Sequence, residues 1–366
     1  MAKWQSVCLP LALRMRRDNQ VMSGLRALGA LILLTGVFAC TRAPSPDLSV
    51  ILADKPAQNL SDYGLFLDPS AQKPAAGVVA YDLINPLFSD YAEKTRYVFV
   101  PDGQSVVYTA QDVLDFPVGT VLVKTFSYAD RALETRLLIH KADGWEAIPY
   151  VWAETDKNAV YAPVGKRLEI AAGVASPEAP AFTYAVPNKN QCKTCHQHGD
   201  AVIPIGPKAR NLNHQGPYGA NQLVDWQSRG LLMGLPLNPT QLPYVSDSAA
   251  NLDARARAYL DINCAHCHKS TGSASNSGLW LDWTESDSVR LGYGKHPTAA
   301  GRGSGQALYV IKPGAPEESI MVYRMASTEA GVAMPELGRA LPDTAGVALI
   351  SDWIANHSEP DKKLTD

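Results

Sequence analysis

The sequence predicts an α+β multidomain fold, in which an N-terminal antiparallel, β sandwich-like domain precedes an α-helical domain. Short β-type segments separated by turn signals fill the stretch from Thr95 to about Tyr161, and no helical pattern lies between them. A bridge rich in Pro and Ala follows at 171–182, and amphipathic helical patterns come later, at 251–268 and 344–357. This order of strands first and helices afterwards is typical of α+β proteins or of separate domains.

Residues 1–39 are predicted to be a secretion signal. The stretch LRALGALILLTGVFAC has a basic flank, an apolar core of signal-peptide length and the small residue Ala39 before Cys40. The apolar run from Ala27 to Ala39 is too short to span a bilayer, since a spanning helix needs roughly 20 apolar residues. A buried core helix is the alternative, but no amphipathic stripe accompanies the run. Met22 lies close before the apolar core and is an alternative start of the chain.

Cys40 is predicted to carry a lipid. The stretch VFAC followed by TRAPSP resembles a bacterial lipobox, in which the cysteine is acylated and becomes the new N-terminus. Phe38 is unusual at its position, and a plain exported protein cut near Ala39 is the alternative. Residues 40–59 include the proline-rich TRAPSPDLSV and are expected to be a flexible lipidated tether. The sequence therefore predicts an exported chain, anchored by lipid at the periplasmic face of a bacterial membrane.

Residues 60–248 are predicted to be the β-rich domain. Turn signals at Asp102-Gly103, Pro117 to Gly119 and Asp143-Gly144 divide its central part. The β segments between these turns are TRYVFVP, QSVVYT, TVLVKTFSY, ETRLLIH and WEAIPYVWAE. Strands at this spacing, without helices between them, predict hairpins of an antiparallel sandwich or open barrel.

Residues 249–360 are predicted to be the helical domain. NLDARARAYLDINCAHCH forms a helix that runs into a pair of cysteines, and TAGVALISDWIANH forms a second helix with apolar residues at helical spacing. A turn at Pro313-Gly314 leads into a short helix near Pro316.

The charge balance argues against nucleic acid as a partner. Removing residues 1–39 leaves 28 basic and 35 acidic residues, a net charge of −7. Binding to a phosphate backbone needs a basic face.

If Cys8 is removed with the signal and Cys40 takes a lipid, the other four cysteines form two Cys-x-x-Cys-His motifs. These motifs are CKTCH at 192–196 and CAHCH at 264–268. Zinc is a poor alternative, because the two cysteine pairs of a zinc site are commonly about 15–20 residues apart, whereas most of a domain separates Cys195 from Cys264 here. A disulfide is the simpler alternative for an exported protein, but a redox Cys-x-x-Cys normally follows a βαβ context, which precedes neither motif.

Covalent haem accounts for the histidine directly after each second cysteine. In a c-type site the two thiols form thioethers with the porphyrin, and the adjacent His lies under the iron as proximal ligand. Histidine fills 8 of 366 positions, so both placements arising by chance have a probability of about 1 in 2,000. The sequence therefore predicts two covalently attached haem c groups, the first held by Cys192, Cys195 and His196 and the second by Cys264, Cys267 and His268.

Met334 in GVAMPELG is the predicted sixth ligand of the second haem, because it lies in the loop before the last helix, where a small cytochrome c presents a thioether sulfur. A methionine that only packs in the core is the alternative. For the first haem, His214 and Met233 are within chain reach, whereas His198 is too near His196 in sequence to reach the opposite face. An open or water-occupied position is the remaining alternative.

Five long stretches, in order, carry a resemblance to a known family. They are PLFSDYAEKTRYVFVPDG, FPVGTVLVKTFSY, ETRLLIHKADGW, ARAYLDINCAHCH and IKPGAPEESIMVYRM. From about Leu60 to the end, the chain resembles an uncharacterised bacterial family of exported dihaem c-type proteins, which also occurs as the C-terminal extension of pyrroloquinoline-quinone-dependent sugar dehydrogenases. The last segment, with GLWLD and MPELG, is similar to the cytochrome c domains common in planctomycetes. The resemblance implies electron transfer at or near the membrane.

A second resemblance concerns the β region. PVGTVLVKTF, a turn at Gly144-Trp145 and a CxxCH at its end are similar to the small β-sandwich c-type cytochromes that oxidise hydroxylamine or bind nitric oxide. The resemblance implies an open distal face at the first haem. The pocket lysine of those proteins would correspond to Lys124, for which a surface position on a strand is the alternative.

These observations predict a dihaem c-type cytochrome that transfers electrons in the periplasm between a dehydrogenase-like partner and an acceptor. The expected partners are a redox protein, such as a quinoprotein dehydrogenase or another periplasmic oxidoreductase, and a membrane reached through the lipid anchor. One alternative is a haem enzyme whose open first iron acts on a small molecule. Another is a non-catalytic subunit whose β domain binds a partner.

Overall fold

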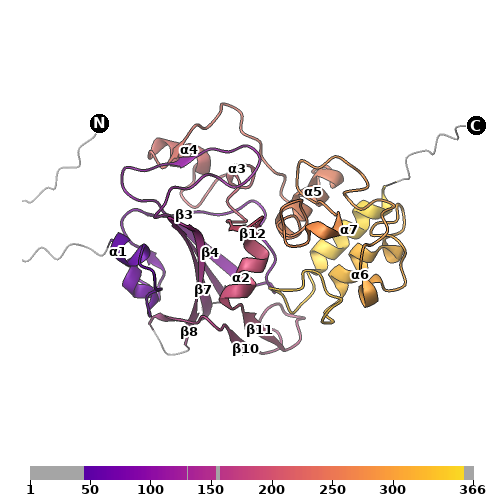
Figure 1. The fold of residues 1–366 in the computed structure, drawn as a ribbon, viewed down its shortest axis with the longest axis horizontal. Helices are drawn as coiled ribbons and strands as arrows, with labels where there is room; N and C mark the ends of the chain where they lie inside the picture. The colour runs from indigo at the N-terminus through magenta and orange to yellow at the C-terminus, as the bar shows by residue number, and fades with distance from the viewer. Residues whose placement is uncertain (1–44, 130, 154–156, 358–366) are drawn as a thin grey trace, which may run out of the picture. The chain divides into compact units, whose positions relative to one another are not determined.

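A six-stranded antiparallel sheet organises the first half of the chain (Figure 1). The computed structural model describes residues 45–129, 131–153 and 157–357. The strands lie in the order β3-β4-β6-β7-β8-β9, so all five neighbouring pairs are consecutive or nearly consecutive in sequence. Their bounds are β3 Val78–Ala80, β4 Glu93–Phe99, β6 Val121–Tyr128, β7 Arg131–Lys141, β8 Gly144–Trp152 and β9 Ala159–Tyr161.

The predicted β segments are confirmed, and so is their antiparallel pairing in the main sheet. Six of the eight residues of β6 are buried, as are six of the eleven of β7, as expected for strands covered on both faces over most of their length. The predicted turn after β7 is tight: Lys141 pairs with Gly144, whose φ of 117° favours glycine. QSVVYT behaves differently, because it contributes only the short strand β5 (Val106–Val107), which pairs in parallel with β14 (Leu232–Met233).

The remaining strands of the described residues form short two-stranded ribbons outside the main sheet. Each ribbon has two strands and an antiparallel register, which leaves little surface of its own to bury. They are β1 Phe66–Asp68 with β2 Lys73–Pro74, β10 Lys166–Ile170 with β11 Phe182–Val186, and β12 Gln197–His198 with β13 Ala201–Val202.

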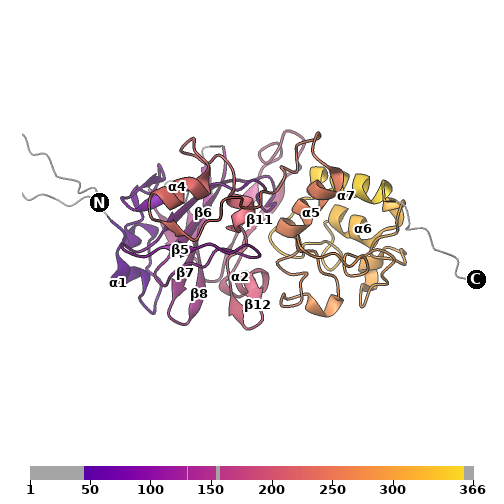
Figure 2. The same cartoon turned by 90° about the horizontal axis from the view of Figure 1, so that it is seen from above.

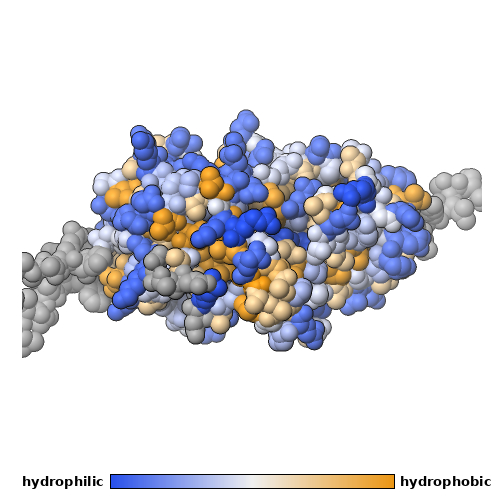
Figure 3. Space-filling model, turned by 90° about the horizontal axis from the view of Figure 1, so that it is seen from below, coloured by the Kyte–Doolittle hydropathy of each residue, from blue (hydrophilic) through white to orange (hydrophobic). Residues whose placement is uncertain are grey.

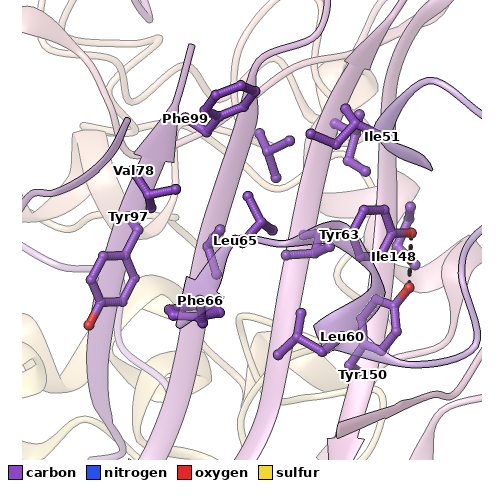
Figure 4. Packing of buried hydrophobic residues seen from close by; sticks show 14 of the residues in the cluster. Ile51, Leu60, Tyr63, Leu65, Phe66, Val78, Tyr97, Phe99, Ile148 and Tyr150 are labelled. Atoms are coloured by element: carbon purple, nitrogen blue, oxygen red, sulfur yellow. Dashed lines mark hydrogen bonds between the residues drawn. The ribbon is translucent and has the colours of Figure 1, made fainter. Parts of the chain in front are cut away.

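One face of the main sheet is covered by the N-terminal segments (Figure 4). Alternate residues of the strands point to this face, as the two-residue period of a strand requires. The chain before the sheet supplies Ile51 from α1 (Leu48–Ile51) and Tyr63 from the 3-10 helix η1 (Leu60–Tyr63). The Tyr63 hydroxyl is hydrogen-bonded to that of Tyr150 at 2.9 Å.

The fold begins earlier than the sequence predicted. The stretch 40–59 was expected to be a tether, but Asp47 caps α1 by accepting the Ser49 backbone N–H at 2.9 Å, and Ile51 is 1% exposed. A single apolar turn with its own cap therefore suffices to dock this segment on the sheet. The predicted signal 1–39 and Cys40 lie outside the described residues.

The other face of the sheet is divided. Val98, Leu122 and Leu138 pack with Tyr81 and Trp226 in a second apolar cluster. Trp226 belongs to α4 (Gln222–Ser228), which follows α3 (Ala209–Leu212). Further along the same face, charged side chains replace the apolar ones and border the cavity described below.

Helices build the second half, and the predicted helices are confirmed. α5 (Leu252–Asn263) and α7 (Thr344–Ala355) pack against each other and against α6 (Ile320–Ala326), with Trp353 and Ile350 at the centre of the cluster. Trp353 also donates its indole N–H to Asp253 at 2.8 Å. Three further 3-10 turns are η2 Ser275–Ser277, η3 Gly301–Ser304 and η4 Pro316–Glu318.

Polar contacts join the strand-rich and helical parts, and the described residues form one compact unit (Figure 2). Asp261 of α5, which is completely buried, binds Lys208 at 3.0 Å and Arg210 at 2.9 Å. Asp90, which follows β3, accepts the backbone N–H groups of Ala340 and Leu341, each at 2.7 Å. These carboxylates therefore hold the helical part against the loops that flank the sheet.

On the face drawn in Figure 3, hydrophobic residues are interspersed with hydrophilic ones. Within the described ranges, no helix has the length and apolar character required to cross a membrane.

Candidate haem-attachment site

A capped helix presents the first motif. α2 (Lys189–His196) begins at Asn188, whose side chain accepts the Gln191 N–H at 2.9 Å while the Gln191 side chain accepts the Asn188 N–H at 3.0 Å. Because residues three and four apart share a helix face, Cys192, Cys195 and His196 project to the same side of α2. Local helix structure therefore brings two thiols and one imidazole together.

The imidazole of His196 is held in one tautomer. Its Nδ1 lies 2.7 Å from the carbonyl oxygen of Ile203, and a carbonyl can only accept, so Nδ1 carries the hydrogen. Burial lowers the pKa of His196 to about 3, which keeps the ring neutral. The Nε2 lone pair is therefore available to bind a metal ion, as in histidine ligands whose other nitrogen is fixed by a carbonyl.

The second motif starts where α5 ends. Cys264 is the C-cap of α5, and the motif then turns, with the His268 backbone N–H donating to the Cys264 carbonyl at 2.9 Å. His268 is 8% exposed, and burial lowers its pKa to about 4. Its Nδ1 lies 3.3 Å from the Ser277 hydroxyl, which itself donates to the Ala274 carbonyl at 2.7 Å. Ser277 therefore accepts from His268, and Nε2 again carries the free lone pair.

The two motifs meet. Cys195 and Cys267 are neighbours, and the interaction of their thiols raises the pKa of Cys195 and lowers that of Cys267. Burial raises the pKa of Cys192 and raises that of Cys264 to about 12. These four cysteines are free thiols in the structure.

A cavity of about 380 Å³ opens beside both motifs, a volume within the usual range for ligand sites, which is about 300–1,000 Å³. Its walls come from β4, β6 and β7, from α2, from α5 and from the loop that follows Val332. The sequence-predicted residues that border it are Cys192, Cys195, His196, Cys264 and Met334. Cys267 and His268 adjoin this group but do not border the cavity.

The Met334 loop is fixed by backbone contacts. The Met334 N–H donates to the Arg324 carbonyl at 3.0 Å, and the Met334 carbonyl accepts from Arg339 at 3.0 Å. Met325 of α6, which is 7% exposed, borders the same cavity. The structure thus brings Met334 into one cavity with Cys264, while its ligation of iron stays a prediction.

His214 lies elsewhere. It is buried after α3, with its Nδ1 3.3 Å from the Tyr244 hydroxyl, and its Nε2 has no hydrogen-bond partner among the described residues. It does not border the cavity that contains His196, and neither does Met233, which is 52% exposed. The structure therefore does not bring His214 together with the first motif.

His266 is a site residue that the sequence analysis missed. It occupies a variable position of CAHCH and borders the cavity, and its buried Nδ1 has no hydrogen-bond partner among the described residues. Its signal in the sequence is a third histidine inside one of the two motifs. Lys124 borders the cavity, which agrees with the pocket position that the second resemblance implied and not with the surface alternative.

Zinc would require four donors that converge. In residues 45–357 as described, no group of three or more His, Cys, Asp or Glu side chains is arranged to hold a metal ion. The donors instead form two separate sets, each with two thiols and one neutral imidazole.

No protein-family model matches this chain, and no curated protein or solved structure is significantly similar to it.

Proposed function

We propose that this chain is a dihaem c-type cytochrome that carries electrons between a dehydrogenase-like partner and an acceptor on the periplasmic side of a bacterial membrane. In this proposal the strand-rich part is a sandwich-like domain with the first haem, and the helical part is a cytochrome c-like domain with the second. A haem iron, when bound, supplies one-electron chemistry between its ferrous and ferric states. Cys40 would hold the chain to the membrane.

The donor sets fit covalently held haem. Each motif offers two thiols for thioether bonds and one neutral imidazole whose Nε2 is free, and the hydrogen bonds of His196 to Ile203 and of His268 to Ser277 orient those rings. Met334, fixed in the cavity by Arg324 and Arg339, is the proposed sixth ligand of the second haem.

The observation that carries the proposal is the contact between Cys195 and Cys267. Two attachment motifs that lie far apart in sequence share one place in the fold, and neither pairs its own cysteines. Fast electron exchange between two haems requires that they lie close together, and the nearness of the two motifs supports such an arrangement.

The test is the intact mass of protein exported in a host with a haem-attachment system. We expect the apo mass plus two haems for the natural chain, and plus one haem for the double variant Cys264→Ala/Cys267→Ala. The matched variant Cys192→Ala/Cys195→Ala should likewise keep one haem. A natural chain that matures fully folded but without haem would refute the proposal.

The haem enzyme with an open first iron is the second candidate, and a specific observation favours it. Two lysines, Lys94 and Lys124, border the cavity next to His196, and neither has an ion-pair or hydrogen-bond partner in the part of the chain that the structure describes. Adding carbon monoxide to the reduced protein separates the two candidates, because only an open iron binds it. Low-spin spectra from both haems, unchanged by carbon monoxide, would exclude the enzyme.

A further inference from the structure

Four cations line the cavity side of the main sheet. Lys124 of β6 pairs directly with Arg96 of β4 on one side and with Arg136 of β7 on the other. Lys94 lies two residues before Arg96, so it points to the same face. All four border the cavity. We call this set the cation ladder: Lys94, Arg96, Lys124 and Arg136.

Like charges directly opposite each other destabilise a sheet, so the ladder requires compensation. The two arginines have such compensation from carboxylates. Arg96 binds Asp82 at 2.9 Å, and Arg136 binds the fully buried Glu134 through two hydrogen bonds, at 2.8 and 2.5 Å. The Tyr184 hydroxyl donates to the same Glu134 carboxylate at 2.6 Å, which satisfies that group further.

The two lysines are not compensated in this way. Lys124 has only the ring of Phe126 beneath it, at 5.1 Å, and Lys94 has no charged group within ion-pair distance among the described residues. Burial, followed by the neighbouring arginines, lowers the pKa of each lysine to about 7. Each lysine is half-buried, so a positive charge there is only partly screened by water.

The acidic groups around the cavity balance the ladder only in part: Asp90 and Asp343 favour the charged form of Lys94, and Glu134 that of Lys124, but none of them forms an ion pair with either lysine among the described residues. Asp90 is engaged by the backbone N–H groups of Ala340 and Leu341. Asp343 accepts the Gly346 N–H at 3.0 Å as the cap of α7, and Glu336 lies 3.6 Å from Arg324. Arg167 and Arg339 add further positive charge to the lining.

We propose that Lys94 and Lys124, supported by Arg136, form a binding site for an anionic oxygen ligand, either a carboxylate or a small oxyanion. The cavity next to His196 provides the space, and two unpaired ammonium groups match one or two negative charges. Two sources have this chemistry. One is the pair of carboxylates on a haem attached at the first motif, which rests on the proposed function. The other is a free anion that enters the cavity, such as nitrite.

The experiment compares the full-length haem-loaded protein with the variants Lys94→Met, Lys124→Met and the double variant. Methionine keeps the length of the side chain and removes the charge. Lys166→Met is the matched control, because Lys166 is exposed on β10 and does not border the cavity. The measurements are nitrite binding to the ferric protein, carbon monoxide binding to the ferrous protein, and the two haem potentials.

If a free anion is the ligand, the double variant binds nitrite at least about ten-fold more weakly, and neutral carbon monoxide binds unchanged. If haem carboxylates are the ligand, nitrite binding is unchanged and the potential of the first haem falls, because loss of positive charge favours Fe(III). A ten-fold change in that equilibrium is about 59 mV for one electron. A double variant that matches Lys166→Met in nitrite affinity and in both potentials overturns the proposal.

The anion site and the haem proposal fail separately. Intact mass reports whether haem is attached. If none is attached, calorimetric titration of the full chain with acetate and with nitrite still tests the site: binding to the natural chain that the double variant loses supports it, and no binding to the natural chain overturns it. Thermal unfolding checks that the variants fold. We expect the ligand-free double variant to melt no lower than the natural chain, because the substitutions remove like-charge repulsion with the neighbouring arginines.

Discussion

Asp261 lies at the centre of a buried charge cluster. Of the charged residues described above, we expect it to be the one whose neutralisation, in Asp261→Asn, destabilises the protein most. Its side chain is completely buried on α5, three residues before Cys264. It accepts hydrogen bonds from Lys208 at 3.0 Å, from Arg210 at 2.9 Å and from the Trp283 N–H at 3.1 Å. The cluster joins α5 to the segment around α3.

The magnitude follows from what the substitution leaves behind. Lys208 and Arg210 are 9% and 4% exposed in their side chains, so neither reaches water when the carboxylate is gone. Removing one partner of a buried ion pair costs about 3–5 kcal/mol. A loss of 1 kcal/mol in the free energy of unfolding lowers Tm by about 2–4 °C in domains of 150–250 residues. Because this unit is larger, we use about 2 °C per kcal/mol, and the expected fall in Tm is about 6–10 °C.

Differential scanning calorimetry of the natural chain and the variant measures this fall. Glu329→Gln is the matched control, since Glu329 and its partner Arg302 are 54% and 73% exposed and exposed pairs contribute only about 0–1 kcal/mol. Equal Tm values for Asp261→Asn and Glu329→Gln would refute the reasoning, because the buried cluster would then contribute no more than a surface pair.

Acidity provides a second check on Asp261. Burial alone would raise its pKa, but Lys208 and Arg210 outweigh burial and hold the pKa below the ordinary value of 3.8. A carboxyl whose folded pKa is lowered stabilises the fold above its unfolded pKa and loses that contribution as pH falls through the folded value. The Tm difference between the natural chain and Asp261→Asn is therefore expected to be constant near pH 7 and to shrink only below about pH 4.

Three further outcomes are expected. Met334→Ala should lower the potential of the second haem and allow carbon monoxide to bind there, whereas Met325→Ala should lose stability but keep a low-spin iron. If Met334→Ala kept the original potential and spin state, Met334 would be a packing residue only. Asp90→Ala should lower the free energy of unfolding by about 1–3 kcal/mol, because it leaves the N–H groups of the Met334 loop unpaired. Asp90→Asn keeps an acceptor oxygen and should lower it less, so equal losses in calorimetry would contradict this explanation. Cys40→Ser should release the protein from the membrane fraction and abolish incorporation of labelled fatty acid, and unchanged membrane association would instead indicate a protein anchor.

The strands and long helices were predictable because their local patterns agree with their surroundings. β6 and β7 have the β-branched and apolar residues of a strand that is covered on both faces, and α7 has apolar residues at helical spacing. The helix that carries the first motif was missed for the opposite reason. KNQCKTCH has no apolar stripe, and its helix depends on the capping box of Asn188 and Gln191.

The site was predictable as a set of residues but not as an arrangement. The two Cys-x-x-Cys-His motifs are visible in the sequence, yet their meeting depends on long-range contacts such as that of Asp261 with Arg210, which no local pattern encodes. The cation ladder was hidden in the same way. Lys94 and Lys124 stand at alternate positions of strands, where a lysine ordinarily faces water, and only the tertiary fold encloses that face.

The contact between Cys195 and Cys267 also has a consequence for how the protein is made. Before any thioether bond exists, these are two free, neighbouring thiols in a chain that is expected to enter an oxidising compartment. Their oxidation to a disulfide would remove one anchoring thiol from each motif in a single event, so one misdirected bond would block both attachments. Biogenesis is therefore expected to depend on a thiol-reducing step after export. A strain without that step should accumulate protein that lacks haem and whose intact mass is lower by two hydrogens. Reduction should make this protein competent for haem attachment again.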